Sequence, residues 1–345
     1  MQEKTPLIGM NLDRLQEIVL EEGLPKFTAR QIAQWIYVKH CRSIDQMSNL
    51  SKAARERLSQ KYEVGVPAPL MVHTSADGTK KYLFGTHTDM AVEAVMIPDG
   101  ERATLCVSSQ AGCRMGCRFC MTGRQGFHGN LSTAQIIGQF LGVEEHDRLT
   151  NTVFMGMGEP MDNLEAVLGA LEILTAPWGF AWSPKRITVS SIGVIPNLKV
   201  LLDQTKVHIA ISLHNPFPSQ RMELMPMEKA WPIEKVLALL RQYDFTGQRR
   251  VSFEYTIFSG LNDSKVHADA LIRLLRGLEC RVNLIRFHAI PDSPLKTAPL
   301  SAMEMFRDRV SAGGITATIR ASRGEDIFAA CGLLSGEHRN GSNDL

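Results

Sequence analysis

From about residue 103 onward, short apolar segments with strand character alternate with segments that have helical spacing. The expected strands span residues 104–108, 151–155, 186–190, 208–212, 251–257, 281–287 and 315–320. The expected helices include residues 133–143, 164–174, 233–243 and 264–275. This alternation predicts an α/β domain with a parallel sheet, open or curled into a barrel, and with helices outside it. Ligands of such folds bind at the carboxyl ends of the strands.

The residues before this domain predict smaller parts. Asn11, Thr28 and Ser51 can each cap a helix, so a helical N-terminal domain is expected. Strand-like residues 79–84 and 90–97 follow the Asp77-Gly78 turn and predict a β-hairpin. The expected division is a helical domain at 1–65, a linker and β-hairpin extension at 66–102, the main domain at 103–335, and a flexible tail at 336–345.

The composition excludes several classes of protein. Of the 345 residues, 44% are hydrophobic and 21% are charged, which excludes a disordered or collagen-like chain. The net charge of +2 excludes a histone-like polycation but not an RNA-binding protein, because binding follows local basic surface. The N-terminal 65 residues hold ten basic and eight acidic residues, so this part is either a solvated helical cap or an RNA-contacting domain.

The chain shows no signal sequence in residues 1–10 and no apolar stretch of about 20 residues that could span a membrane. We therefore expect a cytoplasmic protein that makes no membrane contact. In a reducing compartment, its seven cysteines indicate metal binding or chemistry more than structural disulfides.

Three cysteines directly follow the first expected core strand. Cys113, Cys117 and Cys120 have the spacing C-x3-C-x2-C, and clustered thiolates suit a soft metal. A structural zinc site needs a fourth ligand, for which His128 is a nearby candidate. A [4Fe-4S] cluster held by three thiolates would instead leave one iron open to hold a substrate.

Two further patterns favour an anionic ligand at this place. Residues 102–143 contain no Asp or Glu but four arginines, which gives a locally positive field. The sequence Gly156-Met157-Gly158-Glu159-Pro160 follows the second core strand. Glycines there expose backbone groups, and the carboxylate of Glu159 can accept hydrogen bonds from an ammonium group.

Taken together, these motifs resemble those of the radical S-adenosylmethionine (SAM) superfamily and, more narrowly, the RlmN/Cfr family of RNA adenine methyltransferases. The resemblance also includes Cys106-Val107-Ser108-Ser109-Gln110, Ser212-Leu213-His214, Asn283-Leu284-Ile285, Arg323-Gly324-Glu325-Asp326-Ile327 and Ala330-Cys331-Gly332, and it covers roughly residues 90 to 335. It implies a partial (β/α)6 radical SAM barrel that works as a monomer. It further implies a [4Fe-4S] cluster, two SAM molecules per turnover, and an electron donor such as flavodoxin or ferredoxin.

The resemblance also implies roles for individual residues. Cys331 would carry a methyl group, Cys106 would form a transient disulfide with it, and Glu93 is a candidate proton acceptor. The cluster ligands would be Cys113, Cys117 and Cys120. SAM contacts would come from Gly158, Glu159, Ser190, Ser212, Leu213, His214 and His288, the last at a position where better-known members have asparagine. Cys41 and Cys280 match no family role. We expect nearby arginines to lower the pKa of the Cys106 thiol.

The expected product is 2-methyladenine in 23S rRNA, with tRNA as a candidate second substrate. Pro160 favours this RlmN-like branch over the Cfr-like branch, which methylates C8 and tends to carry alanine there. The alternative from another class is a non-catalytic RNA-binding protein that a closed zinc site stabilises.

Overall fold

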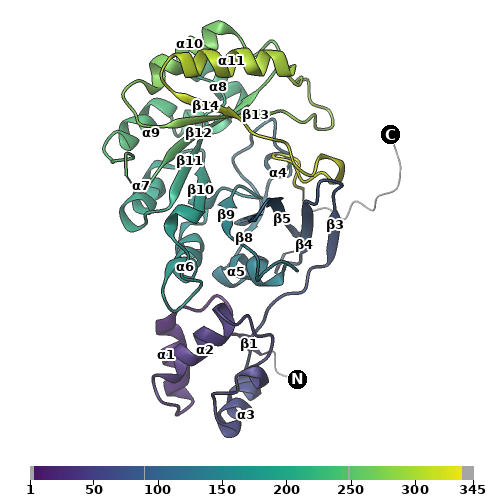
Figure 1. The fold of residues 1–345 in the computed structure, drawn as a ribbon, viewed down its shortest axis with the longest axis vertical. Helices are drawn as coiled ribbons and strands as arrows, with labels where there is room; N and C mark the ends of the chain where they lie inside the picture. The colour runs from purple at the N-terminus through teal and green to yellow at the C-terminus, as the bar shows by residue number, and fades with distance from the viewer. Residues whose placement is uncertain (1–3, 89, 248, 336–345) are drawn as a thin grey trace.

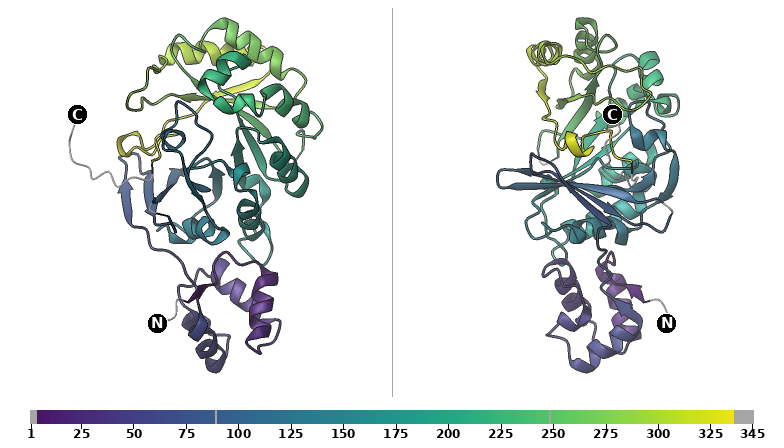
Figure 2. Two further views of the ribbon diagram at one scale, coloured as in Figure 1. Left: turned by 180° about the vertical axis from the view of Figure 1, so that it is seen from behind. Right: turned by 90° about the vertical axis from the view of Figure 1, so that its right-hand side faces the viewer.

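The computed structural model describes residues 4–88, 90–247 and 249–335. The tail predicted at 336–345 lies outside the described residues. Three N-terminal helices gather at one end of the molecule, below a large twisted sheet and its helices (Figure 1). Both further views show the same separation (Figure 2). Among the described helices, we find none long and apolar enough to cross a membrane.

The N-terminal part contains α1 (Leu12–Glu21), α2 (Thr28–Tyr37), α3 (Lys52–Lys61) and the short parallel pair β1 (Thr5–Pro6) and β2 (Tyr62–Glu63). Two of the predicted caps are confirmed. Asn11 accepts from the backbone N–H of Arg14 at 3.0 Å, and Ser51 accepts from the N–H of Ala54 at 3.2 Å.

The prediction that Thr28 caps the second helix is wrong. Phe27 occupies the cap position, and Thr28 is the buried first residue of the helix. The reason is that the N–H of Thr28 already donates to the carbonyl of Pro25, so the chain turns before the threonine is reached.

One sheet of ten strands runs through the rest of the protein, in the order β14-β13-β12-β11-β10-β9-β6-β5-β4-β3. Seven of these strands are mutually parallel. They are β6 (Arg102–Cys106), β9 (Asn151–Phe154), β10 (Ile187–Ser191), β11 (His208–Ser212), β12 (Val251–Ile257), β13 (Arg281–Arg286) and β14 (Thr316–Ile319). All seven predicted strands are therefore present.

The helices that cover this sheet are α5 (Thr133–Gly142), α6 (Leu164–Thr175), α7 (Ile195–Gln204), α8 (Pro218–Leu224), α9 (Ile233–Leu240), α10 (Lys265–Leu275) and α11 (Leu300–Ala312). The strands follow one another in chain order with helical crossovers. This arrangement is a partial (β/α)6 barrel followed by a seventh strand. Strands β11 and β12 are buried along most of their length, as expected of parallel strands covered on both faces, although every second residue of β12 is polar.

The predicted hairpin is part of the same sheet. Strands β4 (Lys80–Phe84) and β5 (Val92–Asp99) pair antiparallel, and β5 pairs with β6. An additional edge strand, β3 (Met71–Thr74), precedes the Asp77-Gly78 turn and pairs with β4. After β6, the short strands β7 (Gln110–Gly112) and β8 (Phe127–Asn130) flank α4 (Met121–Arg124), and they enclose the cysteine loop.

Candidate active site

The three cysteines of the C-x3-C-x2-C motif line one cavity at the carboxyl ends of the strands. The cavity has an empty volume of about 930 Å³, part of it open to solvent, and Cys113, Cys117 and Cys120 all line it. Backbone hydrogen bonds hold their loop in place. The N–H of Cys113 donates to the carbonyl of Gly126 at 2.7 Å, and the N–H of Arg118 donates to that of Leu224 at 3.0 Å.

The donor set fits an iron–sulfur cluster better than a closed zinc site. Burial raises the pKa of Cys113 to about 12, and burial together with the charges of the other two thiols raises the pKa of Cys117 well above its usual value. Such thiols ionise when a cation replaces their protons. Among the described residues, the only three metal-ligating side chains whose ligand atoms all lie within 4.8 Å of one another do not include these cysteines. His128 bonds to the carbonyl of Gln125 at 3.1 Å and does not line the cavity.

The glycine motif after β9 forms another wall of the cavity. Gly158 has φ +100°, and a Cβ added there would lie 2.6 Å from the Cβ of Gln110. A Cβ at Gly156 would lie 2.7 Å from the hydroxyl of Ser108. Both positions therefore require glycine, because the strand end packs directly against the loop that leads to the cysteines.

Glu159 is buried in this wall. Its carboxylate accepts backbone N–H groups from Met161 at 3.1 Å and Ile192 at 2.9 Å. Burial nevertheless raises the pKa of Glu159 to about 7, against the opposing effect of these hydrogen bonds. A bound ammonium group would stabilise the charged carboxylate, which suits the role predicted for Glu159.

Three more predicted residues line the same cavity from neighbouring strands: Ser190, Ser212 and His214. His214 has φ +56° and is buried, and burial lowers its pKa to about 3. Its Nδ1 accepts the N–H of Thr256 at 2.9 Å, so the neutral ring carries its proton on Nε2 and presents a donor.

The structure places the remaining predicted SAM contacts outside the cavity lining. The side chain of Leu213 is fully buried in the core. His288 contacts Ser322 at 3.1 Å and Glu325 at 3.8 Å, within the segment that leads to Cys331. Neither side chain is among those that line the cavity.

Glu93, the candidate proton acceptor, is buried in β5. Its carboxylate pairs with Lys81 at 3.0 Å and accepts the N–H of Ser335 at 3.0 Å. It therefore anchors the segment just after Cys331, and it is not among the residues that line the cavity.

Burial raises the pKa of Cys106, and the charge of the neighbouring Cys331 raises it further. Cys331 lines the cavity, and both thiols are free. The expectation that arginines lower the pKa of Cys106 overall is wrong. Arg320 acts in that direction, but burial outweighs it and raises the pKa to about 12.

The sequence did not reveal two charged groups that hold residues of this site in position. Arg320, at the end of β14, contacts Glu254 at 3.5 Å and the sulfur of Met155 at 3.5 Å, and its charge acts on both Cys106 and Cys331. Its position at the carboxyl end of a predicted strand was the signal that could have identified it.

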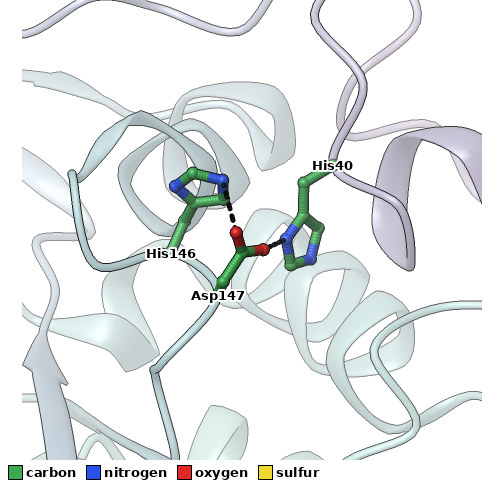
Figure 3. A group of neighbouring side chains, drawn as sticks. All are labelled: His40, His146 and Asp147. Atoms are coloured by element: carbon green, nitrogen blue, oxygen red, sulfur yellow. Dashed lines mark hydrogen bonds and ion pairs between the residues drawn. The ribbon is translucent and has the colours of Figure 1, made fainter.

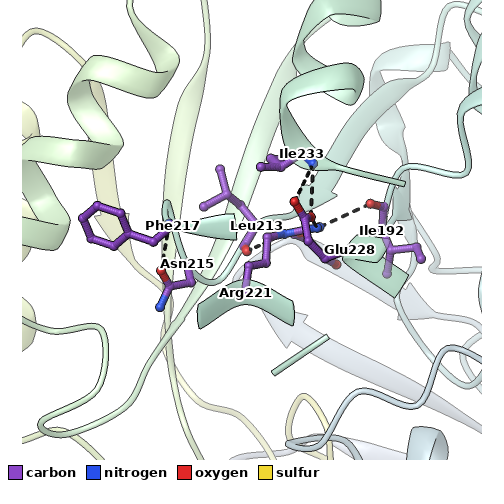
Figure 4. Close-up of polar contacts among 8 residues, drawn as sticks. Ile192, Leu213, Asn215, Phe217, Arg221, Glu228 and Ile233 are labelled. Carbon is purple, nitrogen blue, oxygen red and sulfur yellow. Dashed lines mark hydrogen bonds and ion pairs between the residues drawn. The ribbon is translucent and has the colours of Figure 1, made fainter. Parts of the chain in front are cut away.

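The second is a buried ion pair between Arg221 and Glu228 (Figure 4). Nε of Arg221 donates to the carbonyl of Leu213 at 3.0 Å, and Nη2 donates to that of Ser212 at 2.8 Å. Glu228 accepts the N–H of Ile233 at 3.1 Å. The pair fixes the end of β11 beside the cavity, and no sequence motif marked it.

Comparison with known proteins places this site in a family. A family model described as "Ribosomal RNA large subunit methyltransferase N-terminal domain" matches residues 5–64, and one described as "Radical SAM superfamily" matches residues 107–271. The chain is 56% identical to a "Probable dual-specificity RNA methyltransferase RlmN" from Phocaeicola vulgatus, over 96% of this chain and 95% of that protein. It is 40% identical to a "Dual-specificity RNA methyltransferase RlmN" from Syntrophus aciditrophicus, over 95% of each. The chain belongs to the RlmN family of radical SAM methyltransferases.

The fold of this RlmN family chain agrees with that of a solved relative. The crystal structure of a radical SAM methyltransferase from Sphaerobacter thermophilus superposes with a TM-score of 0.91 at 38% identity, covering 96% of this chain and all of that one. The predicted family, enzyme class and partial barrel are thereby confirmed. Radical SAM family membership implies a [4Fe-4S] cluster and SAM, and the thiols and the cavity that they line fit both.

Proposed function

We propose that this protein methylates C2 of an adenine in 23S rRNA, with tRNA as a second substrate. In this proposal Cys331 carries the methyl group and Cys106 resolves the protein–RNA adduct. The observation that carries the proposal is the proximity of these two cysteines, both within the field of Arg320, beside a cavity lined by the three cysteines of the motif. The dual-specificity names of the relatives support two RNA substrates.

We assign the cluster to Cys113, Cys117 and Cys120, and the methionine end of SAM to Gly158 and Glu159. Ser190, Ser212 and His214 would contact the rest of SAM, because all three line the same cavity. Two SAM molecules per turnover follow from one methyl donation to Cys331 and one radical cleavage. The roles of Leu213 and His288 stay predictions, since neither side chain lines the cavity.

When bound, the cluster and SAM supply the organic radical that activates the methyl group on Cys331. The residues of the chain complete the transfer. Once the carbon is bonded to C2, the adduct has to lose one electron, which the cluster would accept, and the C2 proton. The Cys106 thiolate then attacks the sulfur of Cys331, and an S–S bond forms as the C–S bond breaks. The carbon keeps that electron pair and takes a proton, which leaves a methyl group on the base. That Glu93 accepts the C2 proton stays a prediction, because its carboxylate already pairs with Lys81 and accepts the N–H of Ser335.

The target base must leave its stack to reach the cavity. Exposed Arg118 and Arg124 lie on the cysteine loop and its short helix, and exposed Arg286 lines the cavity itself. We propose that these guanidinium groups contact RNA phosphates near the mouth of the cavity.

We keep the division at 1–65, 66–102, 103–335 and 336–345 as a proposal, with the helical N-terminal domain contacting RNA. Two of its basic residues are already used internally, since Arg57 bonds to the Glu22 carbonyl at 2.6 Å and Lys61 bonds to the Glu22 carboxylate at 2.8 Å. We also propose that the protein works as a monomer. We further propose that a flavodoxin or ferredoxin donates the electrons. The protein would work in the cytoplasm, where the ribosomal substrate is found.

Mass spectrometry of 23S rRNA and tRNA from a strain that lacks the gene tests this function. We expect the 2-methyladenine mark to disappear from both RNAs and to return on complementation. Loss of an 8-methyladenine mark would establish the Cfr-like alternative. Unchanged RNA would favour the non-catalytic RNA-binding alternative.

A further inference from the structure

A second group of metal-ligating side chains lies far from the cysteine loop in sequence, where the N-terminal helices meet the core. His40 follows α2, and His146 and Asp147 lie in the loop between α5 and β9 (Figure 3). Their ligand atoms all lie within 4.8 Å of one another. We propose that these three side chains form a binding site for a divalent transition metal ion of the zinc type, which joins the N-terminal domain to the barrel.

The donor set has the chemistry that such an ion prefers. Two imidazoles and one carboxylate suit zinc and its neighbours, and they leave one position for water. Nδ1 of His40 lies 2.6 Å from Oδ1 of Asp147, and Nε2 of His146 lies 3.5 Å from Oδ2. Ligand atoms about 2.0–2.1 Å from a tetrahedral ion lie roughly 3.3 Å apart. The observed separations of 2.6 and 3.5 Å lie on either side of that value, and the Asp147 side chain, which is 74% exposed, has room to adjust.

The histidines are held in place before any ion binds. Nδ1 of His146 interacts with the carbonyl of Val143 at 3.1 Å, which leaves Nε2 directed at Asp147 as a free ligand. A metal-bound histidine generally uses its second nitrogen in this way. His40 and His146 pack edge to face at 5.2 Å, and His40 also packs against Phe180 at 5.7 Å.

The backbone at His40 is also unusual. His40 has φ +51°, a left-handed conformation that is uncommon outside glycine. Such conformations persist where the surrounding structure holds a side chain in a particular place. Here the conformation presents the imidazole of an N-terminal residue to a loop of the core. The two imidazole nitrogens favour zinc and its neighbours over Ca²⁺ or Mg²⁺, which prefer oxygen ligands.

Zinc binding can be measured on the full-length, cluster-loaded protein under anaerobic conditions, so that the cysteine motif is already occupied. Equilibrium dialysis against Zn²⁺, with iron content followed in parallel, gives the zinc bound per chain. We expect one tight site in the wild type, and binding at least about tenfold weaker in His40→Ala and His146→Ala. His73→Ala, on the distant edge strand β3, is the matched control and should bind zinc like the wild type.

Asp147→Asn provides a variant at an exposed position that is expected to fold normally, and it should also bind zinc more weakly. Zinc should raise the melting temperature of the wild type and of His73→Ala, but not that of the three site variants. The proposal is overturned if zinc uptake and the melting shift are the same in wild type and site variants. It is also overturned if the cluster-loaded wild type takes up no zinc. Loss of zinc binding with methyl transfer retained would leave the proposed function intact, so the two proposals are separable.

Discussion

The backbone N–H of Met121 donates a hydrogen bond to the carbonyl of Gly332 at 2.8 Å. Together with the bond from the Thr122 hydroxyl to the carbonyl of Leu334 at 2.7 Å, it ties the short helix after the three motif cysteines to the segment that carries Cys331. The segment has a second anchor after Cys331, where Ser335 donates to the buried carboxylate of Glu93. Both anchors follow Cys331 in the chain, so the proposed methyl carrier is held beside the cavity by the residues directly after it.

Gly332 makes the first anchor possible, and its replacement tests it. Gly332 has φ +84°, and an added Cβ would lie 3.2 Å from the carbonyl oxygen of Phe119. We expect Gly332→Ala to lower the free energy of unfolding by about 1–2 kcal/mol and to slow methyl transfer strongly. Gly314→Ala, at φ +88° with open space around it, is the control. It should cost similar stability with normal activity, and equal activity of the two variants would contradict the anchoring role.

Arg320 should control the reactivity of the cysteine pair. Its positive charge lowers the pKa of Cys106 and Cys331 against the opposing effect of burial. Arg320→Gln should therefore raise both thiol pKa values and slow alkylation by iodoacetamide at a fixed pH. Peptide mass spectrometry resolves the rate at each cysteine. Arg309→Gln, which removes a surface pair with Asp269, should leave both rates unchanged. Equal alkylation in Arg320→Gln and wild type would refute this role.

The raised pKa of Glu159 predicts that SAM binding depends on pH. With a pKa of about 7, the carboxyl group is protonated below neutrality and loses its attraction for an ammonium group. SAM affinity of the cluster-loaded protein should fall as the pH drops from 8 to about 6. His214, with a pKa of about 3, stays neutral throughout this range. Glu159→Gln should bind weakly at every pH, and a pH dependence retained in this variant would assign the titration to another group.

The same raised pKa predicts an effect on stability with the opposite sign to that of an ordinary carboxylate. The folded state holds this proton more tightly than the unfolded chain. Stability from this group is therefore full at low pH and falls as the pH rises from about 4.5 to 7. Urea unfolding should show Glu159→Gln gaining stability relative to wild type across this window. A constant difference between the two proteins would contradict the raised pKa.

Arg118 offers a test of RNA binding that does not need catalysis. It is exposed on the cysteine loop, next to Cys117 of the cavity, so Arg118→Gln should weaken RNA binding more at low salt than at high salt. The slope of log affinity against log salt should fall in magnitude by about 0.7 for one lost phosphate contact. Arg273→Gln, an exposed change on α10, should leave the slope unchanged. An unchanged slope for Arg118→Gln would place the RNA elsewhere.

The sequence predicted the strands, the cysteine loop and the glycine motif well because each follows from local rules. Apolar runs identified the seven parallel strands, and spacing alone brought Cys113, Cys117 and Cys120 to one loop. The edge strand Met71–Thr74 was missed because a short, half-exposed strand lacks a clear apolar pattern.

Long-range contacts were harder to predict. The burial of Glu93, the contact of Arg320 with Glu254, and the Arg221–Glu228 pair each join residues that no local pattern relates. The pKa of Cys106 was mispredicted for the same reason. Counting nearby arginines ignored burial, which is visible only once the chain is folded.

The central claim is that Cys331 carries the methyl group and Cys106 releases the product. Removing only the releasing thiol tests this claim most directly. Cluster-loaded Cys106→Ala, supplied with SAM, a reductant and substrate RNA, should stop at a covalent protein–RNA adduct. Mass spectrometry should place that bond on the sulfur of Cys331. Cys106→Ala/Cys331→Ala should form no adduct while keeping its iron. Release of free methylated RNA from Cys106→Ala at the wild-type rate would contradict the account.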